Sequence, residues 1–254
     1  MGDNGPKNVL VTGAAKRLGR AIALQLADHG WSVAVHHRNS SQEAEETAAA
    51  IREKCVRAHI VAADLSNEEA TARLVANAAA ELGPLNALVN NASMFEHDTA
   101  DTMTRESWET HIAVNLRAPV LLAQKFAQQL GNRTHGVVIN ILDQRVLKPT
   151  PEFLSYGVTK AGLHWLTTTL AQGLAPHIRV NAVAPGPTLP SARQSKEQFE
   201  RQFSSTVLGH GAQPQDIAAA VLYLIEAQAV TGQTIAVDGG QHLAWRSADV
   251  SGVE

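Results

Sequence analysis

The sequence predicts a doubly wound α/β fold, in which one parallel sheet is covered by helices on both faces. Seven short runs are nearly continuous in hydrophobic residues, as expected for strands that are buried on both faces. They alternate with longer stretches whose apolar residues recur at three- and four-residue spacing, which is the period of a helix. Right-handed crossovers between successive parallel strands then place helices on both faces of the sheet.

The seven predicted strands span residues 8–11, 32–35, 59–62, 85–89, 137–141, 178–182 and 234–237. The predicted helices span residues 18–29, 42–54, 67–82, 105–130, 153–174 and 215–226. No break in composition marks a second domain, so residues 1–254 are expected to form a single domain. Residues 187–214 contain no predicted strand. We interpret them as a mobile flap over the site, because loops of that length in a compact domain are usually functional.

The composition excludes several classes of protein. Of the 254 residues, 44% are apolar and 18% are charged, and the formal net charge is −3. This supports a buried core and offers no basic surface for a polyanion, so nucleic acid is not expected as a partner. No apolar run approaches the ~20 residues of a membrane span, and no secretory signal is found, so we expect a cytoplasmic protein without membrane association. Most histidines are expected at the surface or behind the site, and none has a spacing that predicts a metal.

A glycine-containing turn follows the first predicted strand and runs directly into the first helix. Gly13 and Gly19 bracket Lys16, Arg17 and Leu18. At such a junction, backbone N–H groups and the helix N-terminus bind the pyrophosphate of a dinucleotide. Lys16 and Arg17 add positive charge there. The three-glycine dinucleotide pattern is incomplete, and an ordinary turn with two solvated cations is the alternative.

The end of the second strand predicts NADP(H) rather than NAD(H). No acidic residue occurs between residues 30 and 42, where an NAD enzyme places Asp or Glu on the ribose 2′-hydroxyl. A guanidinium and a hydroxyl group, which suit a 2′-phosphate, occur there instead. The segment consists of His37, Arg38, Asn39 and Ser40. After the third strand, Asp64 precedes Leu65 and either caps the next helix or hydrogen-bonds the adenine amino group.

Tyr156 and Lys160 lie four residues apart in a predicted helix, so both are on one helix face. A free tyrosine has a pKa of ~10 and is a poor acid near neutral pH. A unit charge at ~4 Å is worth up to ~4 kcal/mol at an effective dielectric of ~20, or about three pKa units. We therefore expect Lys160 to lower the pKa of Tyr156 and to make it a proton donor.

Together these motifs resemble the short-chain dehydrogenase/reductase family over nearly the whole chain. The resemblance implies a single Rossmann-like domain that transfers a hydride from a nicotinamide, in a homodimer or homotetramer. It implies that Tyr156 donates a proton, that Lys160 holds the nicotinamide ribose and tunes the tyrosine, and that Asn115 supports a lysine-bound water. The residues that carry the resemblance are Thr12, Gly13, Gly19, Asp64, Asn90, Asn91, Ala92, Ser93, Asn115, Tyr156, Lys160, Pro185 and Gly186.

Asp143 stands where this family has its catalytic serine, 13 residues before Tyr156. A serine hydroxyl donates a hydrogen bond to a substrate carbonyl, whereas an ionised aspartate only accepts. The carboxylate suits a substrate that presents N–H groups, such as a nitrogen heterocycle reduced at a C=N bond, or a chain that passes protons to Tyr156. The alternative is that Asp143 merely ends the fifth strand and points away.

Two departures from the family pattern, Arg17 in place of a loop glycine and Asp143, resemble the pteridine reductases, a subgroup of the family. That resemblance implies that Phe95 and the nicotinamide sandwich a flat pterin, that Ser93 lies beside it, and that Arg17 contacts substrate and phosphate. A core aromatic at a strand end is the alternative for Phe95. The ending at residues 238–243 resembles bacterial dihydropteridine reductases and favours a small side chain on the dihydropterin.

Three hypotheses follow. The first is an NADPH-dependent reductase of a pterin-like C=N bond, with the substrate bound by Arg17, Ser93, Phe95, Asp143 and Tyr156. The second is a general carbonyl or 3-oxoacyl reductase of the same family, against which Asp143 argues. The third is a catalytically silent NADP-binding sensor, which the intact Tyr156, Lys160 and Asn115 disfavour.

Overall fold

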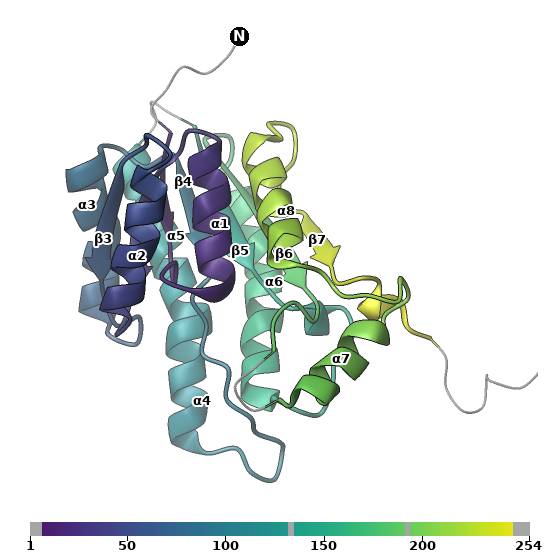
Figure 1. The fold of residues 1–254 in the computed structure, drawn as a ribbon. Helices are drawn as coiled ribbons and strands as arrows, with labels where there is room; N and C mark the ends of the chain where they lie inside the picture. Colours follow the sequence, from purple (N-terminus) through teal and green to yellow (C-terminus); the bar gives the residue numbers. More distant parts are fainter. Residues whose placement is uncertain (1–6, 132–134, 191–193, 246–254) are drawn as a thin grey trace, which may run out of the picture.

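A computed structural model describes residues 7–131, 135–190 and 194–245. Within these ranges the chain forms a seven-stranded sheet between two layers of helices (Figure 1). Every pair of neighbouring strands is parallel, which confirms the predicted fold class. The strands are β1 (Asn8–Val11), β2 (Ser32–His37), β3 (Ala58–Ala62), β4 (Ala87–Asn90), β5 (Gly136–Ile141), β6 (Ile178–Pro185) and β7 (Thr234–Val237).

The strand order β3-β2-β1-β4-β5-β6-β7 reverses direction between β1 and β4. Val11 at the end of β1 is in register with Val35 of β2 on one side and with Val89 of β4 on the other. The carboxyl ends of these strands therefore lie side by side at the reversal. In open α/β sheets, ligands bind in the crevice at this point.

Each face of the sheet has its own hydrophobic core. On one face, α1 (Arg17–Asp28), α2 (Ser41–Arg52) and α8 (Pro214–Glu226) pack over alternate strand residues such as Val9 and Val35. On the other face, α3 (Glu68–Leu82), α5 (Ala118–Leu130) and the end of α6 (Leu154–Leu174) pack over Leu10 and Leu88. Neighbouring residues of one strand thus enter opposite cores, which explains the nearly continuous hydrophobic runs.

The predicted helix 105–130 is interrupted by a π-helical turn. The structure has α4 (Arg105–Ile112), a π-helical segment at Ala113–Arg117 and then α5. Pro119 explains the change, because it has no N–H to donate to the carbonyl of Asn115, which an α-helix would require. Such turns are frequent at functional sites, and this one contains a predicted site residue.

The interval 187–214 is more ordered than a loop. It contains α7 (Lys196–Ser204), which sequence analysis missed, and its last residue begins α8. Ser195 accepts a hydrogen bond from the backbone of Gln198, whose side chain accepts from the backbone of Ser195, so a capping box starts α7. Residues 191–193 of the interval, and both ends of the proposed 1–254 domain, lie outside the described residues.

The remaining corrections to the predicted elements are shifts at their ends. The structure places β4 two residues later at its start than predicted, and it extends β2 to His37 and β6 to Pro185. The two extensions lengthen β2 and β6 at the carboxyl edge of the sheet. His37 and Pro185, the last residues of these strands, therefore lie at the crevice. None of the helices in the described part of the chain is long and apolar enough to cross a membrane.

Candidate active site

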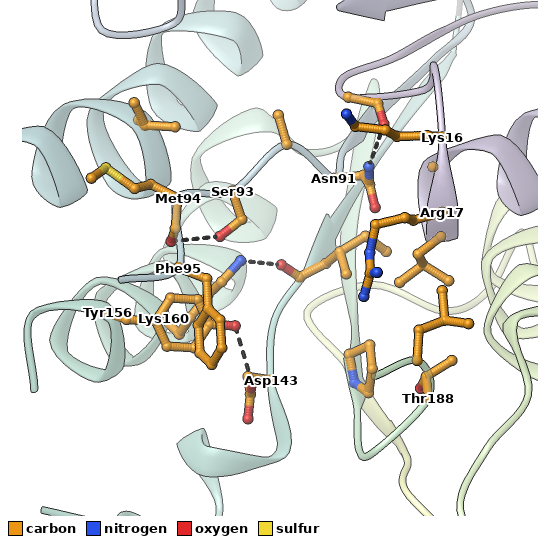
Figure 2. A pocket seen from close by; sticks show the side chains of 18 of the residues that line it. Lys16, Arg17, Asn91, Ser93, Met94, Phe95, Asp143, Tyr156, Lys160 and Thr188 are labelled. Carbon is orange, nitrogen blue, oxygen red and sulfur yellow. Dashed lines mark hydrogen bonds between the residues drawn. The ribbon is translucent and has the colours of Figure 1, made fainter. Parts of the chain in front are cut away.

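A cavity of about 960 Å³ opens at the carboxyl edge of the sheet, where the strand order reverses (Figure 2). Every residue predicted to contact cofactor or substrate lines it, and of the predicted site residues only Asn115 does not. The cavity extends from the end of β2, near Ser40 and Asp64, to Tyr156 on α6. The predicted flap interval also lines it, through residues that were not predicted individually: Pro187, Thr188, Leu189, Gln194, Gln198, Phe199 and Gln202.

The turn after β1 depends on two glycines. Gly13 has a φ of +63°, a conformation that side chains rarely adopt. A Cβ on Gly19 would lie 2.1 Å from the carbonyl oxygen of Gly13, so α1 packs against the turn only because Gly19 has no side chain. The N-terminus of α1 is thereby held at the cavity wall, where its unpaired N–H groups suit a pyrophosphate.

Arg17, which stands where the related loop has its middle glycine, keeps the conformation of a glycine. Its φ is +54°, which is unfavourable for a residue with a side chain. Its guanidinium reaches across the cavity and donates a hydrogen bond of 3.0 Å to the carbonyl of Pro190. Lys16 forms an exposed ion pair of 3.6 Å with Glu43. The two cations therefore lie beside the cavity, and Arg17 also contacts the segment that precedes α7.

His36 is one of the histidines that lie behind the site, and it supports the glycine turn. It is only 2% exposed, and its Nδ1 accepts a hydrogen bond of 3.0 Å from the backbone N–H of Gly13. Its Nε2 is 3.1 Å from the carbonyl oxygen of Ala63 and donates to it in the neutral tautomer that this arrangement requires. Burial lowers the pKa of His36 to about 4, so the ring is neutral near pH 7. It joins the glycine turn to the ends of β2 and β3.

The end of β2 presents a polar corner of the cavity. His37, Arg38, Asn39 and Ser40 all line it, as a 2′-phosphate site would require. His37 is buried, and its Nδ1 has no hydrogen-bond partner among the described residues. Across the corner, Asp64 accepts hydrogen bonds from the backbone and the hydroxyl of Ser66.

Those hydrogen bonds to Ser66 lower the pKa of Asp64. The alternative that Asp64 caps the next helix is wrong. The cap of α3 is Asn67, whose side chain accepts from the backbone N–H of Ala70.

Asn91 ties the end of β4 to the glycine turn. Its side-chain amide donates to the carbonyl oxygens of Thr12 and Gly13, at 2.8 and 3.2 Å. In return, the hydroxyl of Thr12 accepts from the backbone N–H groups of Asn91 and Ala92. Asn91 and Ala92, which both line the cavity, are thus held against the glycine turn.

Asn115 acts from behind the cavity wall. The π-helical turn aims its side chain at the loop that follows β4, where Oδ1 accepts from the backbone N–H of Met94 at 2.7 Å and from the hydroxyl of Ser93. Its Nδ2 donates to the carbonyl of Met94 and to the hydroxyl of Thr159 on α6. Asn115 therefore fixes the segment that presents Ser93 and Phe95 relative to the helix that carries Tyr156. Its predicted role in supporting a lysine-bound water stays a prediction.

Asp143 faces the site. Its Oδ2 accepts a hydrogen bond of 3.0 Å from the hydroxyl of Tyr156 (Figure 2). The same oxygen accepts from the guanidinium of Arg145 at 3.0 Å, and Oδ1 accepts from the backbone N–H of Arg145. The side chain is 15% exposed. The alternative in which Asp143 points away from the site is wrong.

Lys160 lies beneath Tyr156, in a buried position. Its ammonium donates to the carbonyl of Ile141 at 2.8 Å and lies 5.5 Å from the centre of the Tyr156 ring. Burial lowers the pKa of Lys160 to about 8. The pKa of Tyr156 is raised well above its ordinary value, by burial and by the Asp143 carboxylate, while Arg145 acts in the opposite direction. The net pKa of Tyr156 is therefore not lowered, because burial and the nearby carboxylate dominate, while the effect of Lys160 by itself stays a prediction.

Aromatic rings form the outer end of the site. Phe95 stacks on Phe153 with ring centres 4.3 Å apart, and its ring meets Tyr156 edge-on at 4.7 Å. Phe95 is thus in the site and is not a core aromatic. Sequence analysis missed Phe153 and Arg145. The guanidinium of Arg145 lies 5.8 and 5.3 Å from the centres of the Phe95 and Phe153 rings. Proximity to Asp143 along the chain was the only signal for Arg145.

Sequence comparison places the chain in a large family of oxidoreductases. Residues 13–242 match the family described as enoyl-(acyl carrier protein) reductase, a branch of the short-chain dehydrogenases/reductases. A 3-oxoacyl-[acyl-carrier-protein] reductase from Staphylococcus aureus is 34% identical over 242 residues, which cover 93% of this chain and 98% of that protein. The protein belongs to the short-chain dehydrogenase/reductase family.

Solved structures are similar over almost the full length. A FolM alternative dihydrofolate reductase 1 from Brucella suis, crystallised with NADP, is 46% identical with a TM-score of 0.93, and the match covers 98% of this chain and 99% of that one. The protein of the same description from Brucella canis, also complexed with NADP, is 44% identical with a TM-score of 0.91 over 96% of this chain and 98% of that one.

Proposed function

We propose that the protein reduces a C=N bond in a pterin-like heterocycle, with NADPH as the hydride donor. The observation that carries this proposal is the hydrogen bond between Tyr156 and Asp143. It places an acceptor-only carboxylate beside the proton donor, at the position where a carbonyl reductase needs a hydroxyl donor. A carboxylate there favours a substrate that presents N–H groups and disfavours the oxygen of a developing alkoxide.

The shape of the site supports the same substrate class. Phe95 and the edge of Tyr156 give aromatic surfaces at the end of the cavity that Asp143 borders. Stacking on an aromatic ring is worth ~1 kcal/mol beyond burial and suits a planar heterocycle. The similarity to two dihydrofolate-reducing proteins at 44 and 46% identity agrees with this reading.

The residues present fit a dinucleotide with a 2′-phosphate. Arg38 and Ser40 would hold the phosphate, the N-terminus of α1 the pyrophosphate, and Lys160 the nicotinamide ribose. The Nδ1 of His37, buried at this corner and without a partner in the described part of the chain, is a further polar atom that a ligand can satisfy. The protein is an NADP-dependent oxidoreductase of its family, as the sequence predicted.

In the proposed reaction, the cofactor supplies the hydride and the protein supplies position and a proton. Asp143 accepts hydrogen bonds from the substrate's N–H groups and orients the ring. Tyr156 gives its hydroxyl proton to the substrate nitrogen. Lys160 and Arg145 place positive charge near the phenolate that this step creates. Phe95 covers the ring and excludes water from it.

The test is NADPH oxidation, followed at 340 nm, with dihydrobiopterin, dihydromonapterin and dihydrofolate as separate substrates. We expect turnover with at least one of them, and NADH to be a poorer donor than NADPH. A purified protein that binds NADPH and reduces none of the three would contradict the proposal. Tyr156→Phe is the control, because it removes the donated proton while keeping the ring contact with Phe95.

A second candidate is reduction of a 3-oxoacyl thioester, favoured by the 34% identity to the Staphylococcus aureus reductase. Replacing Asp143 by Ser discriminates between the two candidate functions. If the protein is a pterin reductase, Asp143→Ser should lose pterin reduction and gain activity on a 3-oxoacyl thioester. If wild-type protein already reduces the thioester efficiently, and far faster than any dihydropterin, the second candidate replaces the first.

A further inference from the structure

We propose that Arg145 is a positioning residue of the reaction, which holds Asp143 as an ionised acceptor facing Tyr156 and keeps it there when the tyrosine gives up its proton. The inference rests on the proposed function for the substrate, although the geometry that carries it does not depend on the substrate. Sequence analysis assigned no role to Arg145.

Arg145 donates hydrogen bonds to the Asp143 carboxylate from two separate groups. Its backbone N–H donates to Oδ1 at 2.8 Å, and its guanidinium Nη1 donates to Oδ2 at 3.0 Å. The hydroxyl of Tyr156 donates to the same Oδ2. Both side chains of the ion pair are mostly buried, with 20% of Arg145 and 15% of Asp143 exposed. An ion pair with this little exposure is screened much less by salt than a surface pair.

The charges around Tyr156 explain why a second cation is needed. When Tyr156 gives up its proton, a phenolate forms beside the Asp143 carboxylate, which lies only 3.0 Å from the hydroxyl oxygen. Lys160 alone would leave two negative charges facing one positive charge. With Arg145, the two negative charges face two positive charges. The opposite effects of Asp143 and Arg145 on the pKa of Tyr156 agree with this count.

One nitrogen of the Arg145 guanidinium destabilises the folded state, and this also indicates a functional role for the side chain. The Nε of Arg145 is buried and has no hydrogen-bond partner among the described residues. A buried, unsatisfied donor destabilises the folded state, and such groups in native proteins require an explanation. The guanidinium instead lies near the stacked rings of Phe95 and Phe153. Arg145 is thus placed where the acid pair and the aromatic end of the cavity meet.

A double-mutant cycle between Arg145 and Asp143 tests the proposal. The variants are Arg145→Met, Asp143→Asn and the double variant, assayed by NADPH oxidation with saturating cofactor and with each dihydropterin. We expect Arg145→Met to lower kcat about tenfold or more and to change the KM for NADPH by less than about twofold. In the Asp143→Asn background, the same change should lower kcat by less than about twofold, because residues that act through one another are not additive.

Arg145→Lys supplies a rescue variant, since it keeps the charge and loses only the guanidinium geometry. We expect it to recover most of the kcat that Arg145→Met loses. Arg105→Met is the matched control on α4, because Arg105 is exposed and pairs only with Glu109 among the described residues. It should leave kcat unchanged. If Arg145→Met unfolds the protein, Arg145→Gln takes its place in the cycle.

Two results would overturn the proposal. One is an equal loss of kcat from Arg145→Met in the wild-type and Asp143→Asn backgrounds, which would mean that Arg145 does not act through Asp143. The other is an Arg145→Met variant that changes only KM and keeps the kcat of the wild type. Failure of the proposed function is distinguishable, because an enzyme that reduces only a 3-oxoacyl thioester would still allow the cycle on that substrate. An enzyme that turns over none of these compounds would count against both proposals.

Discussion

The hydroxyl of Tyr156 donates a hydrogen bond of 3.0 Å to the carboxylate of Asp143. The proposed proton donor of the site is therefore held by the residue that most clearly departs from the pattern of the family. The contact raises the pKa of Tyr156, since a carboxylate beside a phenol disfavours the phenolate. The electrostatics of the site are consequently set by Asp143, Arg145 and Lys160 together.

Replacement of Asp143 by Asn should lower the pKa of Tyr156, because it removes the negative charge that opposes ionisation. The chain has two tyrosines, Tyr156 and the exposed Tyr223. In a Tyr223→Phe background, the absorbance rise at 295 nm reports on Tyr156 alone. We expect Asp143→Asn to move the onset of that rise to lower pH. An unchanged onset would show that Asp143 does not control the ionisation of Tyr156.

Lys160 should make the protein more stable as the pH rises from about 8 to 10.5. Burial lowers its pKa in the folded state to about 8, so in this window the unfolded chain binds more protons and the free energy of unfolding increases with pH. The full change is of order 3 kcal/mol at ~1.36 kcal/mol per pKa unit. Urea unfolding of wild type and Lys160→Met at pH 7.5, 9 and 10.5 measures it. A stability difference between the two proteins that stays constant with pH would rule it out.

His36 should have the corresponding effect in acid. Its pKa falls from 6.5 to about 4 on folding, so between these values the unfolded chain binds more protons and stability falls as the pH falls. The loss contributed by His36 is of order 3 kcal/mol at pH 4. We expect urea unfolding between pH 7 and 4.5 to be less pH-dependent in His36→Gln than in wild type. His29→Gln, at an exposed residue, is the control and should behave as wild type.

Arg38 should decide between the two nicotinamide cofactors. It is exposed at the polar corner of the cavity, where a 2′-phosphate would lie. We expect Arg38→Ala to raise the KM for NADPH about tenfold or more while changing the KM for NADH little, since a charge-assisted hydrogen bond is worth about 1.5–3 kcal/mol. Arg73→Ala, at an exposed residue of α3, is the control. Equal effects on the two cofactors would contradict the assignment.

The predicted homodimer or homotetramer can be tested on α6. Trp165 is 69% exposed in the single chain, and Val158, seven residues earlier, is 44% exposed. Residues seven apart lie on one helix face, so both belong to one apolar strip that a second copy can cover. We expect Trp165→Ser to shift the mass measured by light scattering toward the monomer. A wild-type protein that is monomeric at micromolar concentration would end this prediction.

The fold was predictable because burial on both faces leaves a strong pattern in each strand. Neighbouring residues such as Val9 and Leu10 enter opposite cores, so both must be apolar. A strand with one face in water would instead alternate between polar and apolar residues. The sequence places Asn115 in the correct helical stretch, but it does not reveal the π-helical interruption, because the helical spacing of apolar residues continues through residues 113–117. The short helix α7 was missed because few of its residues are apolar.

The sequence by itself determined the class of protein, the cavity edge and about half of the residues that line the cavity. These follow from local patterns, such as a glycine turn after a strand or two residues four apart on a helix. Only the tertiary structure decided that Asp143 faces Tyr156, that Arg145 holds Asp143, and that Tyr156 becomes a weaker acid. Ionisation depends on burial and on the distances between charges, and these are set by how distant segments pack together.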